Sequence, residues 1–405
     1  MKLAVFVSEF PKATETFIYR DLTRFRQMGA ELRLYHLSPY RKDQTLHGFA
    51  RVLQDDARYR GFLDGKALMA TLGALVTRPS TVLGTVWTIL HRYARHPKIA
   101  IKSLALVPKS LAIAKELRDW GADHVHAEFA GHPATAAWIG HRVGGPGYSV
   151  SCRAHDIFRT QALLAEKLGE AQAVRTVSCF GKTFLHDKLS NGADLEISVI
   201  HSSIDTKAIE PTDPAIDPAK PRILYVGALE PKKGVEYLID ALALADKRLG
   251  DWRCELIGDG PSAARLKQKA REAGIADRMD FRGMQPFEEV AAAYSRAQVC
   301  VAPSIIGPSG RMEGIPNVMI EALANQRPAV ATNISGLPEL ITDFENGRLV
   351  PERDAAALAE AIAWVFENPE EATAMVRRGR EVVEREFDLS VNAARQMAIF
   401  KGEDD

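Results

Sequence analysis

The sequence predicts an α/β protein with two Rossmann-like, doubly wound domains, each built on a parallel sheet. Short apolar strand patterns alternate with helical patterns along most of the chain, an order typical of parallel sheets covered by helices. The 405 residues exceed what one ordinary hydrophobic core holds, so two domains are expected. Residues 210–220 contain three prolines and no apolar periodicity, which is typical of a linker.

The N-terminal half, residues 1–210, begins with the opening unit of a doubly wound sheet. Residues 3–7 form a buried strand pattern, residues 17–28 a helical pattern ended by Gly29, and residues 31–37 a second strand pattern. Further strands are predicted at residues 123–127, 148–152, 175–179 and 197–200.

Residues 60–118 interrupt this alternation with long helical patterns that are punctuated by Pro79, Pro97 and Pro108. The segment holds ten Lys and Arg side chains against two carboxylates, and apolar residues such as Leu83 and Trp87 fall between the cations at helical spacing. Such a pattern is typical of a helix on an anionic membrane surface. It is equally typical of a core helix with a solvated basic face, and the sequence leaves both interpretations open.

The second half predicts a linker at residues 211–221, an α/β domain at 222–385, and a C-terminal helix and tail at 386–405. Strands are expected at residues 222–227, 253–257, 279–282, 298–302, 329–332 and 347–350. Helices are expected at residues 234–249, 262–273, 286–296, 316–325, 335–342 and 354–366.

Composition excludes several classes of protein. Lys plus Arg and Asp plus Glu number 52 each, so no overall charge favours nucleic acid. The four cysteines are scattered without C-x-x-C spacing, which predicts a reducing compartment and neither a disulfide framework nor a zinc site. The N-terminus lacks a signal-peptide pattern, and no stretch reaches 18 uncharged apolar residues. A cytoplasmic protein is expected, peripheral on the inner face of the membrane if residues 60–118 bind lipid.

A pair of glutamates stands out in residues 311–325. Pro316 suits the first turn of a helix, and residues 318–324 are almost wholly apolar, which predicts a helix inside a large domain. Glu321 interrupts this run, and an embedded carboxylate needs hydrogen-bond donors. Glu313 lies roughly 10 Å away at the helical rise of about 1.5 Å per residue. This span suits the sugar and ribose of a nucleoside diphosphate sugar; alternatively, both glutamates pair with nearby Lys or Arg.

Two turns at predicted strand ends add a phosphate-binding pattern. Gly227 begins a turn that carries Lys232 and Lys233 and leads into a helix, where free N–H groups and the two cations favour a phosphate. Gly258 begins a second glycine-rich turn after the next strand, a weaker signal because any α/β fold needs such turns. Ligands bind beyond the carboxyl ends of parallel strands, so both turns and both glutamates are expected along one sheet edge.

Several segments together resemble the retaining family 4 glycosyltransferases, whose GT-B fold sets two Rossmann-like domains around a cleft. The resemblance covers nearly the whole chain. Glu313 and Glu321, with seven residues between them, are similar to the family's paired-glutamate motif, and residues 226–234 to its donor-phosphate turn. Ser335-Gly-Leu-Pro-Glu339 and Asn346-Gly-Arg-Leu-Val-Pro351 resemble further donor-domain signatures.

Two N-terminal segments resemble one subgroup of that family, the enzymes that build colanic acid and related exopolysaccharides. They are Phe10-Pro-Lys-Ala-Thr-Glu-Thr-Phe-Ile18 and His124-Val-His-Ala-Glu-Phe-Ala130.

The resemblance implies a role for each matched residue. Glu321 is expected to hold the nucleotide ribose, Lys233 the diphosphate and Glu313 the donor sugar. Backbone groups of the residues after Glu313 would lie against sugar and phosphate: Gly314, Ile315, Pro316 and Asn317. The resemblance further implies that the leaving phosphate deprotonates the acceptor hydroxyl, through a short-lived oxocarbenium ion pair. The cations would stabilise the charge that develops on the leaving diphosphate.

The sequence departs from the family pattern at three positions. Ala228 replaces an arginine that binds phosphate, so Arg311 or Arg153 is expected to supply that charge. Arg153 itself replaces a histidine, and His155, two positions later, points the same way at a strand end and could take over its role; equally, His155 is an ordinary loop residue. Ser203 replaces a glycine.

We therefore predict a transferase that moves a hexose from a nucleoside diphosphate sugar, held by the C-terminal domain, to a lipid-linked glycan held by the N-terminal domain. No cofactor or metal is expected: His124, His126 and His132 lack a defined ligand spacing, and no Asp-x-Asp motif occurs. The alternatives are a nucleotide-sugar epimerase of the same architecture and a catalytically inactive scaffold that binds nucleotide sugars.

Overall fold

The computed structural model describes residues 1–12, 15–41, 48–62, 64–158, 160–189, 195–212, 214–307, 310 and 312–403; the side chains of residues 49, 50 and 155 are not described. The chain divides into two compact units. The first comprises Met1–His201 and Asn392–Asp405, and the second Ser202–Val391. The division at Ser202 lies upstream of the expected linker 211–221, which belongs to the second unit. The expected C-terminal segment 386–405 is shared, since residues from Asn392 onward join the first unit.

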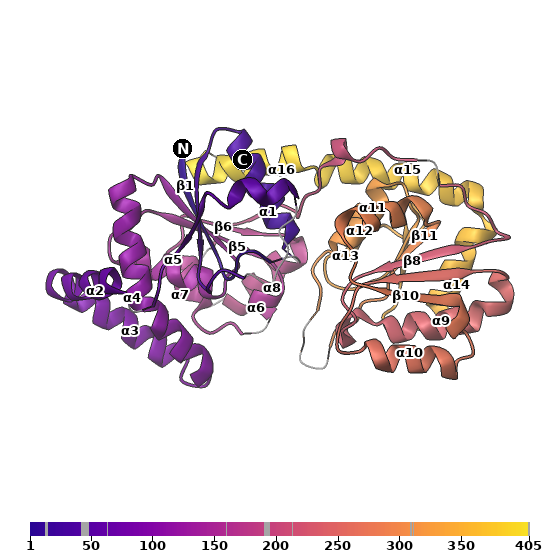
Figure 1. Ribbon diagram of the computed structural model, residues 1–405, viewed down its shortest axis with the longest axis horizontal. Helices are drawn as coiled ribbons and strands as arrows, with labels where there is room; N and C mark the ends of the chain where they lie inside the picture. Colours follow the sequence, from indigo (N-terminus) through magenta and orange to yellow (C-terminus); the bar gives the residue numbers. More distant parts are fainter. Residues whose placement is uncertain are drawn as a thin grey trace. The chain divides into compact units, whose positions relative to one another are not determined.

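Among the described residues of the first unit, seven parallel strands form one sheet in the order β3-β2-β1-β4-β5-β6-β7 (Figure 1). Their bounds are β1 Lys2–Val7, β2 Glu31–His36, β3 Ala57–Tyr59, β4 His124–Glu128, β5 Tyr148–Cys152, β6 Ala173–Thr176 and β7 Ile197–Val199. The sequence did not predict β3. It also placed β6 too late, because Cys179 already begins a helix.

The helices of this unit include α1 Thr16–Gln27, α2 Gly65–Thr77, α3 Pro79–Arg92, α4 Pro97–Trp120, α5 His132–Arg142, α6 His155–Phe158, α7 Leu164–Gly169, α8 Cys179–Leu189 and α16 Leu389–Lys401. Pro79 and Pro97 each begin a helix, as a residue without an N–H can. Pro108 lies inside α4, so the expectation that it interrupts the helical pattern is wrong.

Helices α2 and α3 expose much of their apolar surface. Val76 is 82% exposed, Met69 73% and Trp87 68%. Residues 65–92 carry no Asp or Glu, while Lys66, Arg78 and Arg92 are exposed. We call this surface of α2 and α3 the apolar-basic face. The second interpretation from the sequence, a core helix with a solvated basic side, does not describe α2 and α3, because several of their apolar side chains are themselves exposed.

Not every cation of residues 60–118 contributes to a basic surface. Lys109 is fully buried in α4, where its Nζ donates to Leu37 O at 2.7 Å and lies 4.3 Å from the centre of the Tyr59 ring. Burial lowers the pKa of Lys109 to about 8. Arg60 is ion-paired with Asp64 and with Glu116.

Among the described residues of the second unit, six parallel strands are ordered β10-β9-β8-β11-β12-β13. Their bounds are β8 Arg222–Val226, β9 Arg253–Ile257, β10 Met279–Gly283, β11 Val299–Ala302, β12 Ala329–Thr332 and β13 Arg348–Val350. The helices are α9 Val235–Leu249, α10 Ala263–Glu272, α11 Phe287–Arg296, α12 Asn317–Ala324, α13 Leu337–Leu340, α14 Ala355–Glu367 and α15 Pro369–Glu386.

Apolar side chains cover both faces of this second sheet. Ile223, Leu256 and Val301 pack on the side of α9 and α14, while Leu224, Cys300 and Ala331 pack on the side of α11 and α12 (Figure 1). The predicted fold class of two Rossmann-like parallel-sheet domains is confirmed. In each sheet the chain reverses its direction of winding once, between β1 and β4 and between β8 and β11. Such switch points are where open parallel sheets bind ligands.

Candidate functional site

The predicted site residues of the second unit gather at its switch point, in the loops that follow β8 and β11. Gly234 has φ +63°, and a Cβ there would lie 1.8 Å from Pro303 O. Ile305 N donates to Lys232 O at 2.8 Å. Because only glycine allows this approach, Gly234 fixes the loop that carries the lysines against the loop that leads to Glu313.

Glu313 forms ion pairs with both lysines of the β8 loop. Lys233 Nζ lies 2.8 Å from Glu313 Oε2, and Lys232 Nζ contacts Glu313 Oε1. The side chain of Glu313 is 15% exposed. Burial acts to raise its pKa, but Lys233 and Lys232 together outweigh burial and lower the pKa to about 2. The sequence left open that the glutamates pair with nearby Lys or Arg, and Glu313 does so. Its partners, Lys232 and Lys233, are the lysines that were expected to bind phosphate.

The glycine-rich turn after β9 packs against the lysine loop. Gly227 N donates to Ile257 O at 2.9 Å, and Leu229 N donates to Asp259 O at 3.0 Å. A Cβ on Gly258 would lie 2.0 Å from Gly227 O. The structure thus brings Gly227 and Gly258 together at one sheet edge, as predicted, and a glycine is needed at 258 for the close approach of the two backbones.

Glu321 differs from its expected surroundings. Its neighbours Ile320 and Ala322 are fully buried, yet Glu321 itself is only half-buried on α12. Tyr294 Oη donates to Glu321 Oε2 at 3.2 Å. The expectation of a carboxylate embedded among aliphatic side chains is wrong, because residue 321 lies on the half-buried face of α12 with Asn317 and Val318. Tyr294 was not predicted as a site residue, because its spacing in α11 is that of any core residue.

The residues between the two glutamates form the loop that leads into α12 and the first turn of that helix. The helix was predicted to begin at Pro316, but α12 begins one residue later, at Asn317, and Pro316 immediately precedes it. Ile315 is 8% exposed, and Gly314 is half-buried beside Glu313. Arg311 lies outside the described residues, so its expected contact with phosphate stays a prediction.

Residues 207–382, which contain all these groups, match the family model described as Glycosyl transferases group 1. The chain carries a group 1 glycosyl transferase domain.

Two curated relatives are similar to the chain over nearly its whole length. WcaL of Escherichia coli K12, named as a colanic acid biosynthesis glycosyltransferase, is 29% identical over 96% of this chain and 97% of its own. AmsK of Erwinia amylovora, named as an amylovoran biosynthesis glycosyltransferase, is 28% identical over 98% of both chains.

Solved structures show the same fold at lower identity. Sucrose-phosphate synthase of Thermosynechococcus elongatus superposes with a TM-score of 0.72 at 19% identity, covering 99% of this chain and 98% of its own. HepE of Anabaena, solved in complex with UDP, has a TM-score of 0.72 at 17% identity, covering 99% of this chain and all of its own. At 19% and 17% identity, both similarities show a shared fold.

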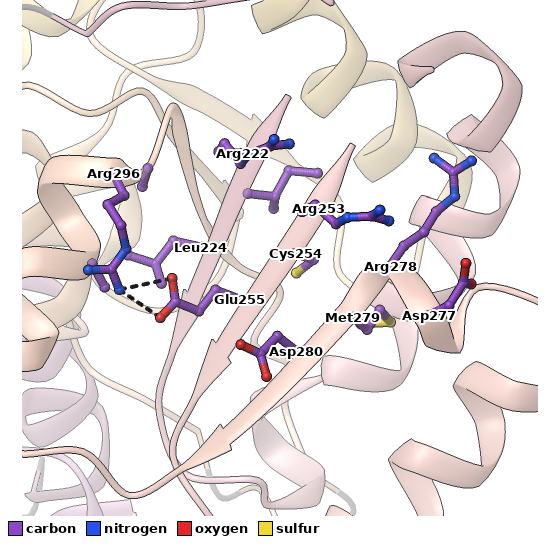
Figure 2. A pocket seen from close by; sticks show the side chains of 13 residues that line it. Arg222, Leu224, Arg253, Cys254, Glu255, Asp277, Arg278, Met279, Asp280 and Arg296 are labelled. Carbon is purple, nitrogen blue, oxygen red and sulfur yellow. Dashed lines mark hydrogen bonds and ion pairs between the residues drawn. The ribbon is translucent and has the colours of Figure 1, made fainter. Parts of the chain in front are cut away.

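A cavity of about 570 Å³ in the group 1 glycosyl transferase domain lies away from the predicted site (Figure 2). Its lining includes Arg222, Arg253 and Met279, which are the first residues of β8, β9 and β10. Figure 2 shows Arg296 bound to both carboxylate oxygens of Glu255, at 2.9 and 3.2 Å. Since ligands of parallel sheets bind beyond the opposite, carboxyl ends, this cavity is a poor candidate for the donor.

Arg153 and His155 lie in the first unit, outside the group 1 domain. Arg153 is 7% exposed, and its Nη2 and Nε donate to Glu128 Oε2 at 3.0 and 3.1 Å. Its guanidinium also lies 4.2 Å from the centre of the Phe17 ring. The charge of Arg153 therefore neutralises a buried carboxylate, and its contact with a phosphate stays a prediction. The backbone of His155 begins α6, while its side chain is not described.

The histidines of β4 serve the core of the first unit. His124 Nε2 and His126 Nδ1 lie 2.7 and 2.8 Å from Ser149 Oγ, and Phe400 lies against both rings. Within the described part of the chain, no three His, Cys, Asp or Glu side chains are placed to hold a metal ion. Likewise, no helix there is both long and apolar enough to cross a bilayer.

Proposed function

We propose that the protein transfers a hexose, with retention, from a nucleoside diphosphate sugar to a glycan acceptor during synthesis of a cell-surface polysaccharide. The family match supports glycosyl transfer, and the names of WcaL and AmsK favour exopolysaccharide as the product. The observation that carries the proposal is the contact of Glu313 with Lys232 and Lys233 at the switch point of the second sheet. In this proposal Glu313 would bind the donor sugar beside two lysines that would bind the diphosphate.

The lysine pair would bind the diphosphate of the donor. Glu313 is ion-paired with both lysines, which leaves a net charge of +1 on the three side chains, and an incoming diphosphate would supply the anionic charge that offsets the lysines. The start of α9, directly after Gly234, adds backbone N–H groups and the positive end of a 15-residue helix. Together these groups would stabilise the negative charge that develops on the leaving diphosphate, so a metal ion is not required.

The two glutamates would hold the sugar and the nucleoside. Once the lysines bind phosphate, the carboxylate of Glu313 becomes available to hydroxyls of the donor sugar. With the lysines in contact, the pKa of Glu313 is held at about 2, and the group then stays ionised and able to accept hydrogen bonds as long as its pKa remains below neutral pH. Glu321 is accessible enough to accept from the ribose, with Tyr294 Oη steadying one of its oxygens.

Calorimetric titration with UDP, GDP and their sugars tests the donor site. We expect one nucleotide to bind and Glu321→Ala to weaken it about tenfold, the loss of roughly 1.4 kcal/mol expected for a hydrogen bond to a carboxylate. Glu371→Ala, an exposed change at the start of α15, serves as the control. Absence of binding for every nucleotide contradicts the proposal, while binding without turnover favours the inactive scaffold.

Two further measurements test the mechanism. The anomeric configuration of the product, read by NMR, is expected to match that of the donor; inversion contradicts retention. Transfer is expected to persist in EDTA, and its loss would show that a metal ion takes part.

The acceptor is proposed to be lipid-linked, and the apolar-basic face of α2 and α3 to lie on an anionic membrane. Exposed Trp87 and Val76 suit the lipid interface, and the absence of carboxylates from residues 65–92 suits anionic headgroups. We expect cosedimentation with phosphatidylglycerol vesicles, and less with phosphatidylcholine. The double variant Val76→Ser/Trp87→Ser should lose this binding, whereas Leu244→Ser, equally exposed on α9, should not.

A further inference from the structure

The loop after β11, residues 303–306, packs against the lysine loop of the candidate donor site. Ile305 is buried and donates its N–H to Lys232 O at 2.8 Å. Gly234 lies so close to Pro303 O that no Cβ fits between them. The position of the lysine loop therefore depends on the position of the loop after β11.

The next residue, Ile306, is held through both its N–H and its C=O by the segment that follows β13. Glu352 Oε2 accepts a hydrogen bond from Ile306 N at 2.7 Å. Arg353 Nη2 donates to Ile306 O. The two side chains also lie beside each other, with Arg353 Nε 3.6 Å from Glu352 Oε2. We call Glu352 and Arg353 the loop clamp, because together they bind the donor and the acceptor of one backbone residue.

The loop clamp extends across the sheet edge. Strand β13 ends the sheet order, and β12 separates it from β11. From this edge Arg353 Nη1 also reaches Tyr237 Oη, in the first turn of α9, in a long hydrogen bond of 3.4 Å. The start of α9 and the lysine loop are the two parts of the phosphate-binding pattern. The clamp thus contacts the first part directly and the second through residues 305–306.

The backbone of Arg353 adopts a conformation that favours glycine. Its φ is +62°, where the Cβ of an L residue crowds a carbonyl oxygen of its own backbone. Glycine would adopt this conformation at a lower cost in free energy. Strain of this kind persists where the surrounding structure imposes it, commonly at functional sites. The side chain of Arg353 makes contacts that glycine cannot make, so mutation can separate the strain from the contacts.

We propose that the loop clamp positions Lys232 and Lys233 for binding of the donor diphosphate. The clamp holds the backbone of residues 305–306, and this backbone holds the lysine loop. Neither clamp residue needs to touch the donor. Lysines that are held in place beforehand lose less conformational freedom when the diphosphate binds. The inference rests on the proposed function, since it concerns the diphosphate of the same donor.

Nucleotide titrations of two variants test the loop clamp. Glu352→Ala and Arg353→Gly should each weaken binding of UDP or GDP, whichever the wild type binds, about tenfold. The two variants remove opposite charges, so an effect of charge alone would strengthen anion binding in Glu352→Ala and weaken it in Arg353→Gly. Glu352→Gln keeps a hydrogen-bond acceptor for Ile306 N and should recover most of the affinity. Wild-type affinity in both Glu352→Ala and Arg353→Gly, or effects of opposite sign, overturns the inference.

Unfolding by urea separates positioning from a general structural role. Arg353→Gly relieves the backbone strain, so its unfolding midpoint should be equal to or above that of the wild type while its nucleotide affinity falls. Gln326→Gly is the matched control, because Gln326, directly after the C-cap of α12, also has a positive φ, of +53°. This control should leave nucleotide affinity unchanged. A midpoint that falls in step with affinity across the variants overturns the positioning role.

Acid unfolding without nucleotide tests the loop clamp separately from the proposed function. The ion pairs of Glu313 with Lys232 and Lys233 stabilise the fold above about pH 4.5 and are lost as pH falls toward 2. If the clamp holds the lysines, the urea midpoint of Arg353→Gly should fall less than that of the wild type between neutral pH and about pH 3. The midpoint of Gln326→Gly should fall as much as that of the wild type.

The two arms have distinct outcomes. If no nucleotide binds the wild type, the proposed function fails, while a reduced acid dependence in Arg353→Gly retains the loop clamp. An acid dependence equal to that of the wild type in Arg353→Gly overturns the loop clamp, whether or not a nucleotide binds.

Discussion

Glu15 is buried and Glu313 is half-buried, each beyond the carboxyl ends of a parallel sheet, and both pair with lysine. Their charges are nevertheless balanced differently. Two lysines contact Glu313 and lower its pKa to about 2 despite burial. One lysine contacts Glu15, and burial raises its pKa despite that partner. The number of neighbouring cations, rather than burial, thus decides whether such a carboxylate is electrostatically satisfied.

This difference leaves the two carboxylates in different electrostatic states. Glu313 and its two lysines keep a net charge of +1, which an anionic ligand can offset. Glu15 keeps a buried oxygen that accepts no hydrogen bond from the described residues.

The largest effect is expected for catalysis by Glu313→Gln. The amide keeps the size of the side chain but removes its charge, so it no longer holds the donor sugar as the ionised carboxylate does. We expect kcat to fall about 10²–10³-fold, the range found when a group that stabilises a transition state is removed. Binding of the nucleotide should be retained, because Lys232 and Lys233 remain. Glu236→Gln, paired with Arg265 near the start of α9, is the control; equal rates for both variants refute the role of Glu313.

The pH dependence of stability should differ in sign between the two glutamates. The pKa of Glu313 falls from 4.5 to about 2 on folding, so its contribution is present above about pH 4.5 and is lost as pH falls toward 2. The contribution amounts to roughly 3 kcal/mol. Glu313→Gln should therefore cost most at neutral pH, and wild type and variant should converge in acid.

For Glu15 the folded-state pKa is raised, so any favourable contribution is present below pH 4.5 and is lost as pH rises through the folded-state pKa. Relative to wild type, Glu15→Gln should thus become more stable with rising pH. Urea unfolding at several pH values measures both slopes. Parallel pH profiles for the two variants would remove the distinction between the glutamates.

Gly234→Ala should disturb the lysine loop and cost at least about 2 kcal/mol of unfolding free energy. The residue has φ +63°, and the added Cβ would collide with Pro303 O. If the loop moves, Glu313 loses its lysines and the acid dependence of stability should diminish. Gly73→Ala, in α2 with nothing within 4 Å of the added Cβ, should instead stabilise by about 0.5–1 kcal/mol. Chemical denaturation compares the two.

The smallest effect is expected for Lys12→Met, which removes the lysine partner of Glu15. The pair is partly exposed on the lysine side, so the loss should be about 1 kcal/mol or less. Loss of the lysine should raise the pKa of Glu15 further, because Lys12 acts to lower it. An acid titration followed by NMR of labelled glutamate carboxyl groups measures this change. Lys115→Met, whose pair with Asp119 is solvent-exposed, should change stability by less than about 0.5 kcal/mol.

Much of the fold follows from local sequence patterns. Strands β5, β9 and β12 occupy the predicted residues, because Gly147, Gly258 and Pro328 each mark one end of a short strand pattern. The pattern is alternating in β5 and β9 and almost wholly apolar in β12. The edge strand β3 has three residues and little burial, so it carries no such pattern. In β6, residues 177–179 continue the strand-like composition beyond the point where the chain turns into α8.

The site was predicted in part, for a related reason. The lysine loop and Glu313 follow strands, and parallel topology brings strand ends together. Glu321 was misjudged because spacing alone does not give the orientation of a short helix. Glu15 was not singled out, although it lies within the Phe10–Ile18 motif. Its burial is what makes it unusual, and the motif does not reveal burial.

Helix α16 ties the first unit to a segment translated after the second. Asn392, Ala393 and Gln396 are fully buried, Arg175 donates to Gln396, and the Phe400 ring fills the space beside His124 and His126. Because residues 392–401 are synthesised last, the packing of the first unit is completed only once the whole chain has been made.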